Sequence, residues 1–537
     1  MTETAASEVL KEIDRRKTFA IISHPDAGKT TVTEKLLLFG NAIHMAGVVK
    51  AKRSKQFARS DWMEIEKQRG ISVASSVMQF QYGGKEINLL DTPGHQDFSE
   101  DTYRVLTAVD SALMIIDSSK GIETQTKKLF QVCRDRKLPI ITFMNKMDLE
   151  ARDPFELVDE VEKVLNLPCF TMTWPIGQGK GFKGVYDLME KRVRFFDAGQ
   201  KTRDFEQKFY SDLDDPELNE AIGPELIDKL KEDCELLTGA GHDFDRERYL
   251  AGNLSPVFFG SAVNNFGIQE LLDAFVRLAP GPRPRPAETR DVKPDEPKFT
   301  GLVFKIQANM DPKHRDRTAF LRICSGEFVQ GMTAYHVRQE REFKINNALQ
   351  FMSKERKNVD RAYAGDIIGI HDKNLTIGDA ITEGERLRFT GVPQFSPDLF
   401  ARVDLKNPIK NKQLQKGLEQ LAEEGTSQIF RRKNTSETFI GVVGQLQFEV
   451  VKFRLLHEYG ADAVFTPLPY ALSCWYHATD KKVMEDFEDY YRSQIVYDVR
   501  GYPMILFKTE WERDYIQKNQ PKVAFYSNLI AYEAECA

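Results

Sequence analysis

A loop near the N-terminus has residue types suited to binding a phosphate chain. Residues 23–30 read Ser-His-Pro-Asp-Ala-Gly-Lys-Thr and lie between an apolar run and a helical pattern. Such a loop needs small residues whose N–H groups surround an anion, a lysine that reaches the β and γ phosphates, and a hydroxyl that binds Mg²⁺. Gly28, Lys29 and Thr30 meet these requirements, whereas Ser23 stands where a glycine is usual. By itself the loop is also compatible with an ordinary glycine turn before a helix. The residues predicted to surround the phosphates are Ser23, His24, Pro25, Asp26, Ala27, Gly28, Lys29 and Thr30.

A second short motif directly follows the expected strand 87–90. Residues 91–95 read Asp-Thr-Pro-Gly-His. An aspartate at the end of a strand can hold Mg²⁺ through water, and a glycine can offer its N–H group to a γ phosphate. That contact would distinguish a triphosphate from a diphosphate. The predicted ligands here are Asp91, Thr92, Pro93, Gly94 and His95.

A third motif has the hydrogen-bonding groups to select a guanine base. Asn-Lys-Met-Asp follows the apolar run 139–143. Guanine presents two N–H donors that one carboxylate can accept, so Asp148 is expected to recognise the base, with about 1.5–3 kcal/mol from each charge-assisted bond. Asn145 would connect loops, and the aliphatic part of Lys146 would cover a face of the base. A Ser-Ala pair after a later apolar run is expected to support the base through backbone N–H groups. The residues predicted to hold the base are Asn145, Lys146, Met147, Asp148, Ser261 and Ala262.

The elements that must position these motifs are short apolar runs that alternate with helical patterns. Each motif follows such a run, and parallel strands bring their carboxyl ends to one edge of a sheet. The sequence therefore predicts an α/β fold with a mainly parallel sheet, helices on both faces and a guanine-nucleotide site at one edge. The expected strands are residues 18–22, 87–90, 112–116, 139–143 and 256–259.

Changes in composition divide the chain into three expected domains. Residues 1–280 would form a GTP-binding domain with an acidic helical insertion at about 165–255. A proline-rich linker, residues 281–297, would hold the chain extended. Residues 298–390 combine strand-like runs with glycine punctuation, which predicts a β-barrel, and residues 391–537 mix helices and strands into an α+β domain.

Bulk composition narrows the class of protein. The 537 residues exceed one ordinary core and suggest about three domains. Their net charge of −6 argues against a protein that coats nucleic acid without specificity. We expect no membrane association, because no apolar run approaches the roughly 20 residues that a spanning helix needs. The polar N-terminus and six cysteines without a C-x-x-C pair favour a cytoplasmic protein.

Taken together, these motifs resemble the translational GTPase family, which contains elongation, initiation and release factors. The resemblance extends to residues 69–72, Arg-Gly-Ile-Ser, which are similar to the first switch segment of the family. In that segment a hydroxyl, usually from threonine, binds Mg²⁺ in the triphosphate state. The resemblance therefore adds Ser72 to the metal ligands. The complete predicted set of metal ligands is Thr30, Ser72 and Asp91.

The resemblance also implies the catalytic residues. His95 occupies the position of the histidine that orients or activates the attacking water in this family. Lys29 would offset charge in the transition state. Family members hold the histidine away with apolar residues until the ribosome activates it. Ile71 fits one side of that arrangement, but Pro25 stands where a valine or isoleucine is common.

Three longer segments resemble the peptide chain release factor 3 branch of the family. They are residues 61–70, 304–322 and 441–450. This resemblance implies a ribosome-dependent GTPase of translation termination. It would promote the departure of class I release factors from the ribosome after peptide release. It would contact those factors directly or indirectly, together with ribosomal RNA and proteins, and would be a monomer.

Two other functions remain open on the sequence. One is a different ribosomal GTPase, of the translocase or ribosome-protection type, which would share every nucleotide residue. The other is a guanine-nucleotide sensor with little turnover. No arginine is evident that could complete the site, so hydrolysis without ribosomes is expected to be slow.

Basic residues suggest where ribosomal RNA could be contacted. The helical pattern over 442–457 is instead expected to pack in the core through Leu446, Val450, Phe453 and Leu456. The predicted RNA contacts are Arg402, Lys406, Lys410, Lys412, Lys416, Arg431, Arg432 and Lys433, with Lys313, Arg315 and Arg317 as a second cluster.

Overall fold

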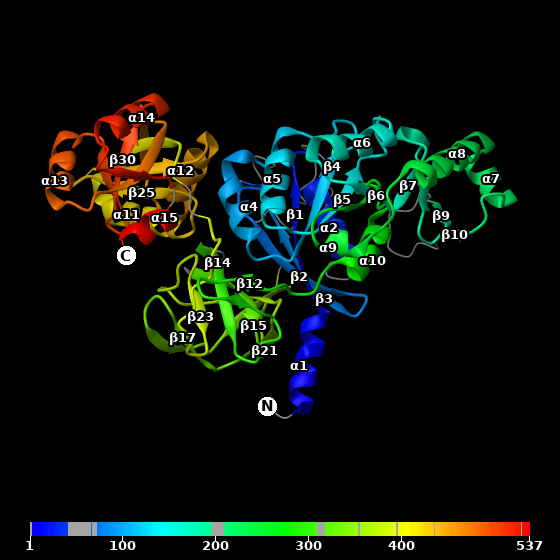
Figure 1. The fold of residues 1–537 in the computed structure, drawn as a ribbon, viewed down its shortest axis with the longest axis horizontal. Coiled ribbons are helices and arrows are strands. Elements are labelled where there is room, and N and C mark those ends of the chain that lie inside the picture. Colours follow the sequence, from blue (N-terminus) through cyan, green and yellow to red (C-terminus); the bar gives the residue numbers. More distant parts are fainter. Residues whose placement is uncertain are drawn as a thin grey trace.

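Three groups of elements follow one another along the chain. The computed structural model describes residues 3–40, 66, 72–195, 209–308, 317–352, 355–393, 396–433, 435, 437–527 and 529–536. Figure 1 shows the first region at the right, the second below it and the third at the left. Helix α1 (Glu3–Arg15) extends from the first region towards the N-terminus.

The first region is built on a mainly parallel sheet in the order β2-β3-β1-β4-β5-β11-β6. Every pair is parallel except β2 with β3, which is antiparallel. One face is covered by α2 and α10 and the other by α4, α5 and α6, because the apolar sides of these helices enter two separate cores. The predicted α/β architecture is confirmed. The strands are β1 Arg16–Ser23, β2 Ser76–Tyr82, β3 Lys85–Asp91, β4 Ser111–Asp117, β5 Ile140–Asn145, β6 Cys169–Thr171 and β11 Ser255–Phe259. The helices are α2 Lys29–Phe39, α4 Ser99–Val105, α5 Thr124–Asp135, α6 Pro154–Leu165 and α10 Ile268–Leu278.

The acidic insertion contains strands as well as the expected helices. Four strands form a small antiparallel sheet in the order β10-β9-β8-β7. The Trp174 Nε1–H group donates to Asp233 Oδ2 over 2.9 Å and ties the longest of these helices to the sheet. Each of these strands has only two to four residues, which is too short to show an alternating pattern in the sequence. The elements are β7 Thr173–Ile176, β8 Gly184–Asp187, β9 Arg192–Phe195, β10 Phe209–Tyr210, α7 Pro216–Ile222, α8 Pro224–Ala240 and α9 Arg246–Leu250.

The proline-rich segment folds back on itself, although an extended linker was expected. Strand β12 (Arg285–Pro286) pairs with β13 (Asp291–Val292). Ala287 also bridges to Phe389, at the far end of the second region. The segment therefore contacts the second region through Ala287, while Arg283 and Arg285 at its start bond to Asp110 of the first region.

The second region is a curled antiparallel sheet, in agreement with the β-rich domain expected there. Its strand order is β18-β17-β23-β14-β15-β22-β19-β20, and β16 pairs separately with β21. Its core lies inside the curl. The strands are β14 Thr300–Ala308, β15 Arg317–Ser325, β16 Glu327–Val329, β17 Thr333–His336, β18 Arg341–Lys344, β19 Ala348–Met352, β20 Glu355–Asn358, β21 Arg361–Tyr363, β22 Ile367–Ile370 and β23 Ala380–Thr382.

The third region combines an antiparallel sheet with helices, as an α+β domain requires. Its strand order is β27-β24-β26-β25-β29-β30-β28-β31. The helix expected over 442–457 begins three residues later, because residues 438–442 belong to a strand. The strands are β24 Leu399–Leu405, β25 Gln428–Arg431, β26 Thr438–Val442, β27 Ala463–Pro467, β28 Leu472–His477, β29 Ile495–Asp498, β30 Pro503–Phe507 and β31 Ala524–Tyr526. The helices are α11 Asn411–Glu423, α12 Gln445–Tyr459, α13 Lys481–Tyr490, α14 Glu510–Asn519 and α15 Leu529–Cys536.

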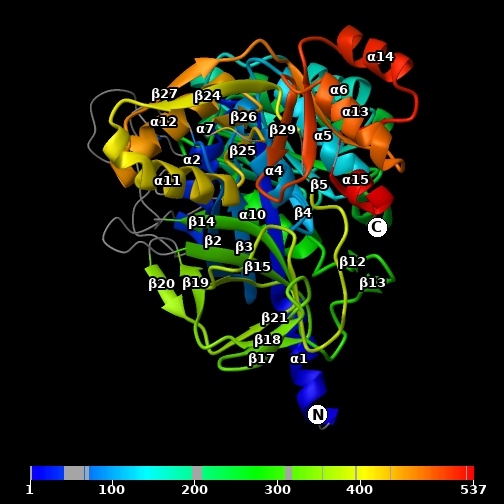
Figure 2. The same cartoon turned by 90° about the vertical axis from the view of Figure 1, so that its left-hand side faces the viewer.

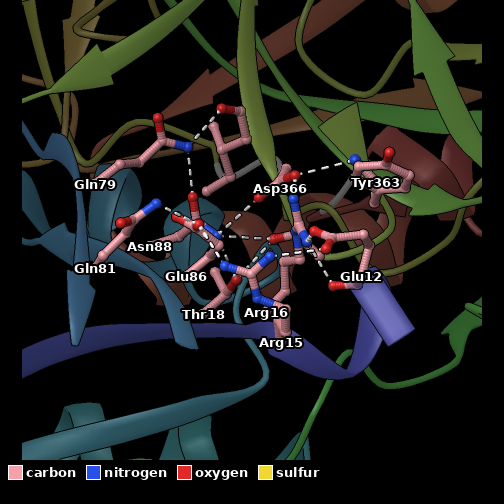
Figure 3. Close-up of polar contacts among 12 residues, drawn as sticks. Glu12, Arg15, Arg16, Thr18, Gln79, Gln81, Glu86, Asn88, Tyr363 and Asp366 are labelled. Carbon is pink, nitrogen blue, oxygen red and sulfur yellow. Dashed lines mark hydrogen bonds and ion pairs between the residues drawn. The ribbon is translucent and has the colours of Figure 1, made fainter. Parts of the chain in front are cut away.

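Buried polar contacts join the first region to the second (Figure 3). The Arg16 guanidinium donates to Asp366 Oδ2 over 3.1 Å, and Thr18 Oγ1 donates to the carbonyl of Gly365 over 2.7 Å. Gln79 Nε2 donates to the carbonyl of Ile367 over 3.0 Å. Since these donors lie on β1 and β2, the second region is attached directly to the sheet that positions the predicted site.

A buried glutamate of the third region bonds to the second region. Figure 2 shows α11 next to β14 at this junction. Glu424, just after α11, accepts the N–H group of Ala308 over 2.8 Å and also pairs with Arg454 of α12. Both charged side chains are almost fully buried. No helix in the described part of the chain is long and apolar enough to cross a membrane.

Candidate nucleotide site and switch region

The predicted phosphate loop lies between the end of β1 and the start of α2. Gly28 is the N-cap of α2 with φ of 93°, a left-handed conformation that favours glycine. A Cβ atom there would also lie 2.3 Å from Asn145 Nδ2, so any other residue would disturb the loop. No side chain caps the first N–H groups of α2. These groups can therefore bind an anion, as the sequence predicted.

The lysine of the loop is paired with the aspartate of the second motif. Lys29 Nζ lies 2.7 Å from Asp91 Oδ1, and both side chains are buried. Asp91 Oδ2 is also buried and has no hydrogen-bond partner among the described residues. A buried carboxylate oxygen without a donor is costly, which makes it a fitting ligand for a cation or its bound water. Thr30 and Ser72, the other two predicted metal ligands, are half-buried, and their hydroxyls are hard oxygen donors of the kind that Mg²⁺ accepts.

Not all residues of the second motif face a ligand. Thr92 is fully buried, and its hydroxyl donates to the carbonyl of Ile21 over 2.6 Å. Its predicted role as a ligand is therefore replaced by a structural one, because this bond fastens the loop to β1. A Cβ atom on Gly94 would lie 3.4 Å from the backbone of Pro25, so the two loops touch here. Ile71, the other residue expected beside the histidine, lies outside the described residues.

His95 lies at the start of a short 3₁₀ turn, η1 (Gln96–Phe98). Its Nδ1 atom accepts the N–H group of Asp97 over 3.2 Å. Its side chain is 36% exposed, so a ligand or a ribosomal group can reach it. The ring therefore has both a fixed backbone partner and access from outside.

Asn145 holds the base loop to the phosphate loop, which is the role predicted for it. Its Nδ2 group donates to the carbonyl of Ala27 over 2.9 Å, and its Oδ1 atom accepts the N–H group of Ala262 over 2.9 Å. One amide thus connects three loops at the edge of the sheet.

Ser261 and Ala262 were predicted to support the base through their backbone N–H groups, but the structure uses these groups elsewhere. The N–H group of Ser261 donates to the carbonyl of Phe266 over 2.9 Å, and that of Ala262 is used by Asn145. Neither group is free to support a base in this structure, because both satisfy partners within the protein. Met147 is likewise fully buried in the core and not a ligand.

Asp117 is a site residue that the sequence analysis missed. Its Oδ2 atom lies 2.7 Å from Lys146 Nζ, which also donates to the carbonyl of Asp26 over 2.5 Å. Burial would raise the pKa of Asp117, but the hydrogen bonds from Lys146 and Ser119 outweigh it and lower that pKa. Asp117 fixes the lysine whose stem would cover the base. It ends β4 at the same edge as the other motifs, which is the signal that could have revealed it.

The Asp148 side chain is half-buried, and no donor in the described part of the chain bonds to its carboxylate. This carboxylate is therefore free to accept the two N–H donors of a guanine. His24 has instead a protein neighbour, since its Nε2 atom lies 3.2 Å from Glu123 Oε1.

A second residue missed in the sequence, Lys305, extends from β14 to Ser75, three residues after the predicted metal ligand Ser72. Its Nζ group donates to both the carbonyl and the hydroxyl of Ser75 over 2.7 Å and lies 3.2 Å from Asp101 Oδ2. Asp101 lies on α4. The signal in the sequence is a lysine within a mostly apolar strand-like run, since such a lysine needs a polar partner once the strand is buried.

Several of the predicted RNA contacts already have partners within the protein. Five of the eight basic residues in 401–435 form ion pairs with carboxylates of the third region. Lys410, Lys412 and Lys416 are exposed and have no such partner among the described residues. The Arg317 side chain is 9% exposed and donates to the carbonyls of Asp372 and Leu375, so most of its donors are used within the protein. Lys313 and Arg315 lie outside the described residues.

Comparisons with known proteins cover nearly the whole chain. Residues 14–281 match the model of the elongation factor Tu GTP binding domain, and residues 298–384 match elongation factor G domain 2. Residues 389–517 match the model described as class II release factor RF3, C-terminal domain. A crystal structure of a protein from Thermus thermophilus has a similar fold, with a TM-score of 0.67 and 21% identity over 87% of this chain and 71% of that one.

Proposed function

Because the chain belongs to the translational GTPases, which bind and hydrolyse GTP in association with the ribosome, we propose that it acts in translation termination. There it promotes the departure of class I release factors from the ribosome after peptide release. The single observation that carries this proposal is the match of the α+β region to the C-terminal domain of class II release factors. On this proposal the protein works as a cytoplasmic monomer whose partners are the ribosome and, directly or indirectly, class I factors.

The nucleotide pocket supplies the chemistry for a GTP-dependent switch. Lys29 and the N-terminus of α2 bind the phosphates, while Asp91, Thr30 and Ser72 would hold Mg²⁺, which offsets phosphate charge. Moving a two-state equilibrium from mostly one form to mostly the other needs about 5.5 kcal/mol of differential binding. Several charge-assisted hydrogen bonds to the γ phosphate can supply that difference.

His95 is the group that we assign to water positioning. It follows Gly94, which touches the phosphate loop, and its side chain is partly exposed. A ribosomal contact can therefore turn the ring towards the γ phosphate, so that hydrolysis is slow until the ribosome binds.

Asp148→Asn is expected to change the base preference of the pocket. An asparagine offers one acceptor and one donor, which match N1–H and the C2 carbonyl of xanthine but not the two donors of guanine. We expect GTP affinity to fall about 100-fold or more and XTP affinity to rise, because two charge-assisted bonds are lost. Titration with fluorescent GTP and XTP analogues measures both.

The control for this experiment is Glu150→Gln, which also replaces a carboxylate by an amide, at an exposed position two residues away. It should leave both affinities unchanged. Equal GTP affinity in wild type and Asp148→Asn would show that Asp148 does not read the base.

The proposed role is tested on ribosomes stalled at a stop codon with a labelled class I release factor bound. Protein plus GTP should accelerate dissociation of the labelled factor, and protein plus GDP should not complete the cycle. A parallel arm uses ribosomes carrying peptidyl-tRNA in the state before translocation. Movement of the tRNA there, without any effect on the release factor, would instead assign a translocase. Nucleotide binding without ribosome-stimulated turnover would assign a sensor.

A further inference from the structure

The turn that follows the proposed catalytic histidine is bonded to the third region of the chain. Asp97, in η1, accepts the N–H group of Leu446 through Oδ2 over 2.7 Å. Leu446 lies in the first turn of α12, whose N-cap residue is a glycine without a side chain to cap the helix. Asp97 supplies that cap from 349 residues earlier in the sequence.

The other oxygen of Asp97 faces the histidine. Asp97 Oδ1 lies 3.3 Å from His95 Nδ1, and the backbone N–H group of Asp97 lies 3.2 Å from the same atom. The N–H group can bond only to an unprotonated Nδ1 atom, whereas the carboxylate can bond only to a protonated one. In either protonation state the ring is therefore held by residue 97.

The approach of α12 to Asp97 depends on Gly444. A Cβ atom on Gly444 would lie 2.1 Å from Asp97 Cγ, far inside van der Waals contact. The backbone of Gly444 has φ of −139° and ψ of 156°, an extended conformation that any residue adopts. Glycine is therefore required here by the space that Asp97 occupies and not by its own backbone.

Apolar packing keeps this contact in place. Val73, Phe98 and Val450 are buried together, and Leu446 and Phe453 pack against them. The face of α12 that was expected to enter a core thus packs against Val73 and Phe98 of the first region. Leu456, which was expected on the same face, is 45% exposed. A displacement of α12 would consequently move Asp97 and Phe98 together.

We propose that Asp97 is a positioning residue for His95, and that its bond to α12 makes GTP hydrolysis depend on the position of the C-terminal α+β region. The inference rests on the proposed catalytic role of His95. It assigns regulation of that site to the same region that matches the release-factor model. A displacement of about 1 Å can reduce a rate up to about 100-fold, so a small movement of α12 is sufficient.

Gly444→Ala tests this coupling without changing any residue of the nucleotide pocket. At saturating ribosomes we expect single-turnover GTP hydrolysis to slow about tenfold or more, because the added methyl group displaces Asp97. GTP and GDP affinities should stay within about twofold, and so should the ribosome concentration that gives half-maximal rate. Gln445→Ala, at the exposed neighbouring position, is the matched control and should retain the wild-type rate.

A double-mutant cycle separates coupling from general damage. Asp97→Ala should also slow hydrolysis, and adding Gly444→Ala to it should cost nothing more, since the side chain that the methyl group meets is gone. Asp97→Asn retains the size and the capping oxygen, so it should slow hydrolysis while melting like wild type. Because it changes the oxygen that faces His95 and keeps the bond to α12, this variant tests the positioning of His95 even if Gly444→Ala does not fold.

Three results would overturn the inference: an unchanged rate in folded Gly444→Ala or Asp97→Asn, losses that multiply in the double variant, or a change confined to the half-saturating ribosome concentration. Failure of the proposed function is distinct, because it would appear in the wild type as a lack of ribosome stimulation.

Discussion

His95→Ala is expected to lower ribosome-stimulated GTP hydrolysis by about 10³-fold. A side chain that positions or activates the attacking water typically contributes 10²- to 10⁴-fold. Nucleotide affinity should stay close to wild type, because the side-chain contacts found for His95 involve Asp97 and Phe98 and no residue that binds phosphate. Single-turnover phosphate release with saturating ribosomes measures the rate, and fluorescent GDP binding checks the pocket.

This experiment has two controls: a variant of a second histidine, and the same assay without ribosomes. His242→Ala removes a surface histidine of similar exposure, 3.4 Å from Glu162, and should behave like wild type. Without ribosomes, His95→Ala and wild type should hydrolyse GTP at similarly slow rates. Full stimulation of His95→Ala by ribosomes would mean that the ribosome alone positions the water, and our assignment of His95 would be wrong.

Asp110→Ala is expected to destabilise the protein by about 3–5 kcal/mol, the range for removing one partner of a buried ion pair. Asp110 is fully buried immediately before β4, and its Oδ2 atom pairs with Arg322 of β15, which is equally buried. Oδ1 accepts from Arg285 over 2.8 Å and from the N–H group of Arg283 over 2.9 Å. Its loss would leave the Arg322 charge without a carboxylate partner at the junction of the first two regions.

Urea unfolding followed by circular dichroism measures this effect through the midpoint of the transition. A chain of several regions does not unfold in one step, so midpoints are compared and not extrapolated energies. Asp14→Ala is the control, because Asp14 forms an exposed ion pair with Lys85 at 2.9 Å. Such pairs contribute about 0–1 kcal/mol. Equal midpoints for the two variants would show that the pair with Arg322 contributes no more than a surface contact.

The structure brings together several residues of the predicted nucleotide site, because the determinants of that prediction are local. A phosphate loop, an aspartate after a strand and an Asn-Lys-x-Asp motif each combine residue type with short spacing. The sheet of the first region brings all of them to one edge. Lys29 and Asp91 consequently meet, and Asn145 connects the loops as its position suggested. Alternating apolar runs were likewise sufficient for the α/β architecture, because side-chain periodicity reflects burial in a sheet or helix.

Other features were decided only by the tertiary structure. The Thr92 hydroxyl bonds to Ile21 of β1, and the N–H group of Ala262 bonds to Asn145, 117 residues earlier in the sequence. The N–H group of Ser261 is occupied within its own loop by the carbonyl of Phe266. The contacts of Lys305 with Ser75 and of Asp97 with Leu446 span 230 and 349 residues.

The physical reason is the distance along the sequence between the residues that determine each feature. Residue type and spacing decide which backbone groups and charges a short loop can present, so a single sequence is enough to predict the pocket. The orientation of the histidine depends instead on a carboxylate shared with a helix of another region. That arrangement exists only once the regions have packed together.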